Sequence, residues 1–172
     1  MPDKAAENKP GKTYDPRPAA TRLAAVQAVY ELDMMDAPVD EVLASFSAER
    51  WLAADEDIDA EMARPKPELL KELVSGTRAR QADIDAALQP GMLQNRVVDK
   101  LESVMQAILR TATYELLARK NVPARTIISA YTAISDAFFD EKGQQARLIA
   151  GILNTVARNL RASEFATPGE IV

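Results

Sequence analysis

The side chains that most enzymes use for catalysis are missing from this chain, which contains no cysteine and no histidine. Thiolate nucleophiles, histidine general bases, disulfides and the usual zinc sites are therefore excluded. The six glycines never cluster, so the chain cannot build a phosphate-cradling loop or a dinucleotide-binding motif. These absences predict a protein that is not an enzyme and that needs no cofactor.

Carboxylates are densest at Asp55, Glu56, Asp57, Asp59 and Glu61. Such a cluster could hold a cation, but it lacks the central glycine and the terminal glutamate geometry of an EF-hand loop. We therefore predict a solvated acidic loop at this place, and no metal site.

Arginines remain as the candidates for binding chemistry. Arg17 and Arg22 lie at the start of the first predicted helix, and Arg110, Arg119 and Arg125 lie in or beside the fifth. A cation at a helix N-terminus is poorly matched to the helix dipole, so a neighbouring phosphate would relieve both charges. The alternative is that these are ordinary solvated arginines, and charge alone favours it.

The net charge of −5 is unevenly distributed along the chain. Residues 1–22 carry a net charge of +2, residues 23–95 carry −9, and residues 96–172 carry +2. Phosphate contacts depend on local positive potential, so nucleic acid would be repelled by the middle of the chain. The sequence thus restricts any RNA contact to the two ends.

The elements that must position these residues are helices. Aromatic residues make up only 5% of the chain, and apolar residues, 47% of it, recur at helical spacing. Prolines and glycines separate the periodic segments. The pattern predicts an all-α protein with helices over residues 19–35, 39–53, 68–88 and 97–101, a central helix running from 101 past 116, and two more that follow Val122-Pro123 and Gly143.

The same pattern suggests how the chain is organised. Residues 1–17 read as a flexible arm, residues 18–162 as one domain with bundles at about 18–88 and 96–162, and residues 163–172 as a flexible tail. No apolar run approaches the length of a membrane helix, and the N-terminus lacks the apolar core of a signal peptide. We therefore expect a cytoplasmic protein.

Three strings in the chain are similar to a known family. Residues 22–30, Arg-Leu-Ala-Ala-Val-Gln-Ala-Val-Tyr, resemble the opening helix of NusB proteins. Residues 109–116, Leu-Arg-Thr-Ala-Thr-Tyr-Glu-Leu, with Val-Pro at 122–123, resemble the family's central segment, and Gly-Ile-Leu-Asn at 151–154 resembles its Gly-Val-Leu-Asp. The matches keep the family's order across about residues 17–162.

The resemblance implies a NusB-type fold of about seven helices in two packed bundles. It also implies a transcription antitermination factor that pairs with NusE, a small ribosomal subunit protein, and binds the boxA element of nascent ribosomal RNA. The pair helps RNA polymerase to read through terminators. Together, the resemblance and the basic ends of the chain suggest RNA contacts at the following residues: Arg17, Arg22, Tyr30, Arg110, Arg119 and Phe138.

The departures from the family pattern fall on the surface expected to bind RNA. Many members have consecutive arginines where residues 17–22 read Arg-Pro-Ala-Ala-Thr-Arg. Ser129 and Ala130 replace the usual Asn-Glu, Asp136 replaces a lysine, and residues 148–151 have lost a phenylalanine and an asparagine. Each lost phosphate contact weakens binding, so we expect weak intrinsic RNA affinity.

The sequence leaves two alternative functions, and an alternative structural role for Tyr30 and Phe138. The chain could be a scaffold that binds NusE with weak or no intrinsic RNA binding. A NusB-like domain of an RNA cytosine methyltransferase is disfavoured, because the chain has no cysteine and no glycine-rich cofactor loop. Tyr30 and Phe138 fall on apolar stripes, so core packing is an alternative role for both. The sequence leaves a homodimer open.

Overall fold

The structure, a computed structural model, describes residues 14–48, 64–93, 96–140 and 143–166. These residues contain seven α-helices and no strand, which confirms the predicted all-α class. The helices are α1 Arg17–Met35, α2 Val39–Ala48, α3 Pro67–Ala79, α4 Gln81–Leu88, α5 Ser103–Ala118, α6 Ala124–Phe138 and α7 Gln144–Leu160. Among the described residues, no helix is long and apolar enough to cross a membrane.

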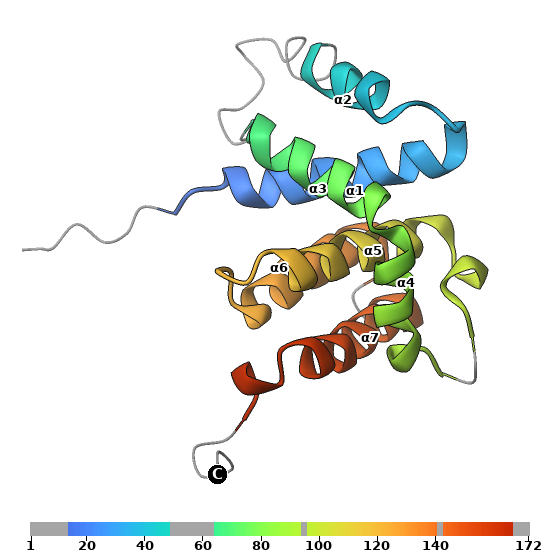
Figure 1. Cartoon of the computed structure of the whole chain (residues 1–172), viewed down its shortest axis with the longest axis vertical. Coiled ribbons are helices and arrows are strands. Elements are labelled where there is room, and N and C mark those ends of the chain that lie inside the picture. Colours follow the sequence, from blue (N-terminus) through green and yellow to red (C-terminus); the bar gives the residue numbers. More distant parts are fainter. Residues whose placement is uncertain (1–13, 49–63, 94–95, 141–142, 167–172) are drawn as a thin grey trace, which may run out of the picture.

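Helix α5 is the centre of the molecule, as its apolar stripe predicts. Every residue from Met105 to Leu116, apart from Gln106, is buried. Helices α1, α3, α4, α6 and α7 all pack against it. In Figure 1, α1, α2 and α3 lie on one side of α5, and α4, α6 and α7 lie around its other sides. Residues of α5 therefore reach both groups of helices.

Helix α1 begins two residues before the predicted start. Arg17 is its first residue, and Pro18 occupies the first turn, where its missing N–H has no partner to lose. The helix ends at Asp36, whose φ of 49° places it in the left-handed region that aspartate tolerates better than most residues. Its long buried face packs on α3 and α5.

The prediction of one continuous helix over residues 68–88 is wrong. The chain breaks at Arg80, whose φ of −106° and ψ of 20° lie outside the helical range, so α3 and α4 are separate helices. Helix α3 packs mainly on α1 and α5, whereas α4 packs on α5 and α7. The short helix predicted at 97–101 is a 3₁₀ turn at Val98–Lys100.

Gly76 on α3 lies where the ring of Tyr114 on α5 comes close, and a Cβ at this position would collide with that ring. Alanine normally favours a helix over glycine by about 1 kcal/mol, but overpacking against a buried ring costs about 1–3 kcal/mol. We expect Gly76→Ala to lower the free energy of unfolding, measured by urea denaturation. In a Tyr114→Leu background the same change should raise it. A stabilising effect in the native background would contradict this packing.

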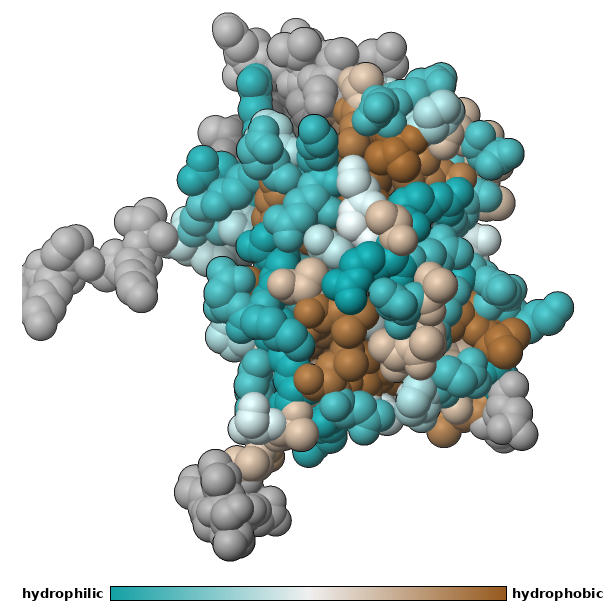
Figure 2. All heavy atoms as spheres, in the orientation of Figure 1, coloured by the Kyte–Doolittle hydropathy of each residue, from teal (hydrophilic) through white to brown (hydrophobic). Residues whose placement is uncertain are grey.

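Hydrophilic residues cover most of the face seen in Figure 2, and hydrophobic residues reach the surface in patches between helices. The predicted acidic loop at 55–61 lies outside the described residues, as does the arm up to residue 13. Of the predicted tail, residues 163–166 are described. The 3₁₀ turn Ala162–Glu164 enters this segment, and Phe165 packs partly buried against the core.

Candidate functional site

Arg22 is buried between three helices and is held by a carboxylate. Its Nε and Nη2 donate to the two carboxylate oxygens of Glu115 at 2.7 and 3.1 Å. The hydroxyl of Tyr131 on α6 donates to the same carboxylate at 2.6 Å, and Arg119 Nε lies 3.6 Å from it. The guanidinium therefore faces inward and ties α1 to α5 and α6.

Burial and charge act on the pKa values of this cluster. Burial raises the pKa of Tyr131 well above its usual value, and the negative charge of Glu115 raises it further. For Arg22, burial alone would lower the pKa, but hydrogen bonds and the charge of Glu115 outweigh it, so the net shift is upward. Arg22 thus stays charged, and Tyr131 stays neutral as a hydrogen-bond donor.

Arg110 is fixed in a second internal cluster. Its Nε and Nη2 donate to both oxygens of Asp85 on α4 at 2.8 and 2.9 Å, and Nη2 also donates to Asp99 at 2.8 Å. Nη1 donates to Gln106 at 3.0 Å and lies 3.9 Å from Asp33 on α1. The side chain is 3% exposed, so its donors are directed at the protein itself.

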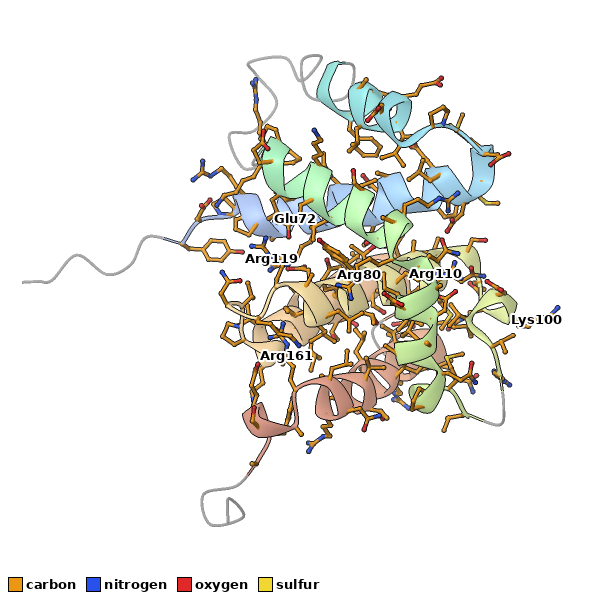
Figure 3. All side chains as sticks on the ribbon, in the orientation of Figure 1. Glu72, Arg80, Lys100, Arg110, Arg119 and Arg161 are labelled. Atoms are coloured by element: carbon orange, nitrogen blue, oxygen red, sulfur yellow. The ribbon has the colours of Figure 1, made fainter. Side chains whose placement is uncertain are left out.

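The remaining two predicted arginines lie nearer the surface, and each has an acidic partner. Arg119 Nη1 lies 2.8 Å from Glu72 on α3, and the two side chains point toward each other in Figure 3. Arg17 binds the carboxylate of Asp15 through Nε and Nη2, both at 3.0 Å. Hydrogen bonds from Arg17 lower the pKa of Asp15 to about 2, so this pair stays ionised at neutral pH.

Tyr30 and Phe138 are on the surface. Tyr30 is 36% exposed and Phe138 is 43% exposed, so neither is a fully buried core residue, although more than half of each is covered. Exposed aromatic faces are the groups on which unpaired RNA bases stack. The structure thus leaves both side chains available to a partner.

A groove of about 1020 Å³ separates the N-terminal half of α1 from α6. Small side chains form much of its wall, and Tyr14 lies at its edge with 78% of its surface exposed. The lining residues include Ala19, Ala20, Leu23, Ala24, Gln27, Arg125, Ser129, Ala130, Ala133 and Ala137. This groove was not predicted from the sequence, although both segments carry alanines at helical spacing, which could have indicated it.

Arg161 is a further residue that sequence reasoning missed. Its guanidinium lies beyond the end of α7 and donates to the backbone carbonyls of Glu115, Leu116, Arg119 and Val122. The carbonyls of Leu116 and Val122 have no other donor among the described residues, whereas those of Glu115 and Arg119 also accept from the backbone N–H groups of Arg119 and Val122. No local pattern marks this arginine, because its acceptors lie 39 to 46 residues earlier in the chain.

The model of the NusB family matches residues 19–158, which is most of the chain and includes all seven helices except the ends of α1 and α7. The chain belongs to the NusB family. This membership confirms the predicted function in transcription antitermination, and also that the protein is not an enzyme, since NusB proteins are antitermination factors without catalytic activity.

Relatives of the NusB family cover nearly the whole chain. The transcription antitermination protein NusB of Rhodopseudomonas palustris strain BisB18 is 32% identical over 170 residues, which is 95% of this chain and 96% of the relative. That of Sphingopyxis alaskensis is 37% identical over 143 residues, covering 83% of this chain and 93% of its own. The family assignment therefore applies to the full helical domain.

Solved structures of NusB proteins share the fold. Thermotoga maritima NusB superposes with a TM-score of 0.66 at 24% identity, over 88% of this chain and 97% of its own. NusB in a crystal structure with NusE and double-stranded RNA gives a TM-score of 0.67 at 18% identity, over 85% and 99%. The predicted NusB-type fold is confirmed.

Proposed function

We propose that the protein pairs with NusE, binds the boxA element of nascent ribosomal RNA together with it, and supports read-through by RNA polymerase in the cytoplasm. The observation that carries this proposal is the family match over residues 19–158. A protein of the same fold has been crystallised with NusE and double-stranded RNA, which supports both partners.

Burial divides the proposed RNA-binding residues into two groups. Arg17, Tyr30 and Phe138 are exposed, so we keep them as proposed direct contacts. Arg22 and Arg110 direct their donors at internal carboxylates, so in our proposal they hold α1, α4 and α5 in place rather than touch RNA. The Arg119 side chain is 23% exposed and paired with Glu72, so we keep it as a proposed contact that must compete with this carboxylate.

The ion pairs support weak intrinsic RNA binding. Each of the four predicted arginines already has a carboxylate within 3.0 Å, so binding a phosphate means competing with an acid of the same chain. Useful affinity then depends on NusE, as we propose. The same ion pairs also favour the alternative that the protein is a scaffold that binds NusE without RNA. An experiment must distinguish these two functions.

The test is a titration of fluorescently labelled single-stranded boxA RNA with the protein, with and without NusE, at two salt concentrations. We expect weak binding by the protein alone and tighter, salt-dependent binding by the pair. NusE binding without any RNA binding would establish the scaffold alternative. Sedimentation of the free protein in the same buffers decides whether it is a monomer or a homodimer.

The proposed aromatic contacts give a sharper prediction. A base stacked on an aromatic side chain contributes about 1–3 kcal/mol, so Tyr30→Leu and Phe138→Leu should each weaken RNA binding by the NusE complex about 5- to 150-fold. Thermal unfolding should change little, because both side chains are exposed. Met35→Ala, on the same helix as Tyr30 and 68% exposed, is the matched control and should leave RNA binding unchanged. Unchanged affinity in both leucine variants would remove these residues from the RNA surface.

A further inference from the structure

Two arginines from different helices converge on one aromatic ring near the C-terminal end of α7. The guanidinium carbon of Arg125, in the first turn of α6, lies 5.3 Å from the ring centroid of Phe165. That of Arg158, in the last turn of α7, lies 5.0 Å from the same centroid. We call these three residues the arginine–phenylalanine clamp. It brings two positive charges to one place.

The two guanidiniums of the clamp are not neutralised within the described part of the chain. Both side chains are exposed, and neither has an ion pair or a hydrogen bond with another described residue. They differ in this from Arg17, Arg22, Arg110 and Arg119. Among the described residues, no acidic group occupies their N–H groups, which can therefore bind an external anion.

The surroundings of the clamp hold it in place without cancelling its charge. Phe165 is partly buried and packs against the core, so the ring has a fixed position. The neighbouring acid, Glu164, already accepts from the backbone N–H of Ala124 at 2.7 Å and from Arg161 Nη1 at 3.2 Å. Lys120, exposed and close enough to affect the pKa of Glu164, adds a further positive charge.

The position of Arg125 favours a phosphate as the partner. It lies in the first turn of α6, where Glu164 accepts from the backbone N–H of Ala124 but makes no ion pair with Arg125. A planar guanidinium stacked on a ring keeps its N–H edge available for two parallel hydrogen bonds to a phosphate. Arg125 also lines the groove between α1 and α6, so the clamp adjoins the groove that runs along the N-terminal half of α1.

We propose that the arginine–phenylalanine clamp binds two backbone phosphates of the RNA. The inference rests on the proposed RNA-binding function and adds a second contact region, at the ends of α6 and α7, to the one on α1. It also assigns a role to residue 165: the ring is a positioning residue that holds both guanidiniums ready for phosphate. Many NusB proteins have consecutive arginines at the start of α1, and the clamp compensates in part for their absence from this chain.

The test uses the full-length protein in complex with NusE and fluorescently labelled single-stranded boxA RNA. A single-strand phosphate contact contributes about 0.7 to the slope of log affinity against log salt, which corresponds to about fivefold in affinity at 0.1 M salt. We expect the double variant Arg125→Gln/Arg158→Gln to bind RNA about 25-fold more weakly, with the slope reduced by about 1.4. Phe165→Leu keeps an apolar side chain but removes the ring face, and should weaken binding with a smaller change in slope.

The matched control removes two exposed cations elsewhere, Lys71 on α3 and Lys100, which lies at the opposite edge of the molecule from Arg161 in Figure 3. Lys71→Gln/Lys100→Gln should leave affinity and slope close to those of the native protein.

If the native complex binds RNA and the clamp variant matches it in affinity and slope, the clamp proposal is wrong while the proposed function stands. Loss of NusE binding with unchanged RNA affinity would also overturn it, and would place the clamp in the contact with NusE instead. Failure of the native complex to bind RNA would instead reject the proposed function.

Discussion

Replacing Glu115 with glutamine should lower the free energy of unfolding by about 3–5 kcal/mol, the usual cost of breaking a buried ion pair. Glu115 is fully buried and accepts both hydrogen bonds of Arg22 as well as that of Tyr131. A neutral amide in its place leaves the Arg22 cation uncompensated in the core. Urea denaturation of the native and variant proteins measures the loss.

Two further variants make this prediction specific. Glu72→Gln breaks the Arg119 pair, in which both partners are partly exposed, and should cost no more than about 1 kcal/mol. The double variant Arg22→Met/Glu115→Leu removes both charges and should recover much of the stability, because apolar residues can replace a buried ion pair. A loss below about 1 kcal/mol for Glu115→Gln would show that the carboxylate is not what holds the three helices together.

The helices could be predicted from the sequence where the apolar residues of a segment fall on one helical face. The apolar stripe of α5 predicts its burial, and the breaks at Val122-Pro123 and Gly143 predict the starts of α6 and α7. The break at Arg80 was not predictable, because neither Arg80 nor Gln81 disfavours a helix. It arises because α3 packs on α1 while α4 packs on α5 and α7. The helix propensities of single residues do not indicate how α3 and α4 must pack.

The arginines show why the candidate site was harder to predict than the fold. Glu115, which holds Arg22, is 93 residues away in sequence, and Asp85, which holds Arg110, is 25 residues away. A count of charges treats both as surface cations. A signal did exist for Arg22: it precedes the buried residues Ala25 and Val29 by one and two helical turns. An arginine on a buried stripe predicts an internal partner, but does not say which one.

Arg125, Arg158 and Phe165 could not be grouped from the sequence for the same reason. In the sequence, Arg125 is a basic residue beside the central helix, whereas residue 165 lies in the segment predicted to be a loose tail. Only the packing of that segment against the core brings the ring to the two arginines. A partner surface made of three separate segments is a tertiary property.

The second large effect is expected at Arg161, which the sequence does not distinguish from other arginines. Arg161→Met should lower the free energy of unfolding by about 2–6 kcal/mol, because the carbonyls of Leu116 and Val122 lose their donor and each buried carbonyl left without one costs about 1–3 kcal/mol. The side chain donates to the carbonyls of Leu116 and Arg119 at 2.9 and 2.8 Å, and also to those of Glu115 and Val122. Methionine fills a similar space but has no donor.

Arg161→Lys should lose less than the methionine variant, because an ammonium group can reach some of these carbonyls but not all of them in the planar arrangement of a guanidinium. Arg147→Met, an exposed position on α7, is the control and should change stability by no more than about 0.5 kcal/mol. Hydrogen exchange should show faster opening of the last turn of α5 in the Arg161 variants. Equal stability of the methionine variant and the native protein would mean that water satisfies these carbonyls, and that the junction of α5, α6 and α7 does not depend on this side chain.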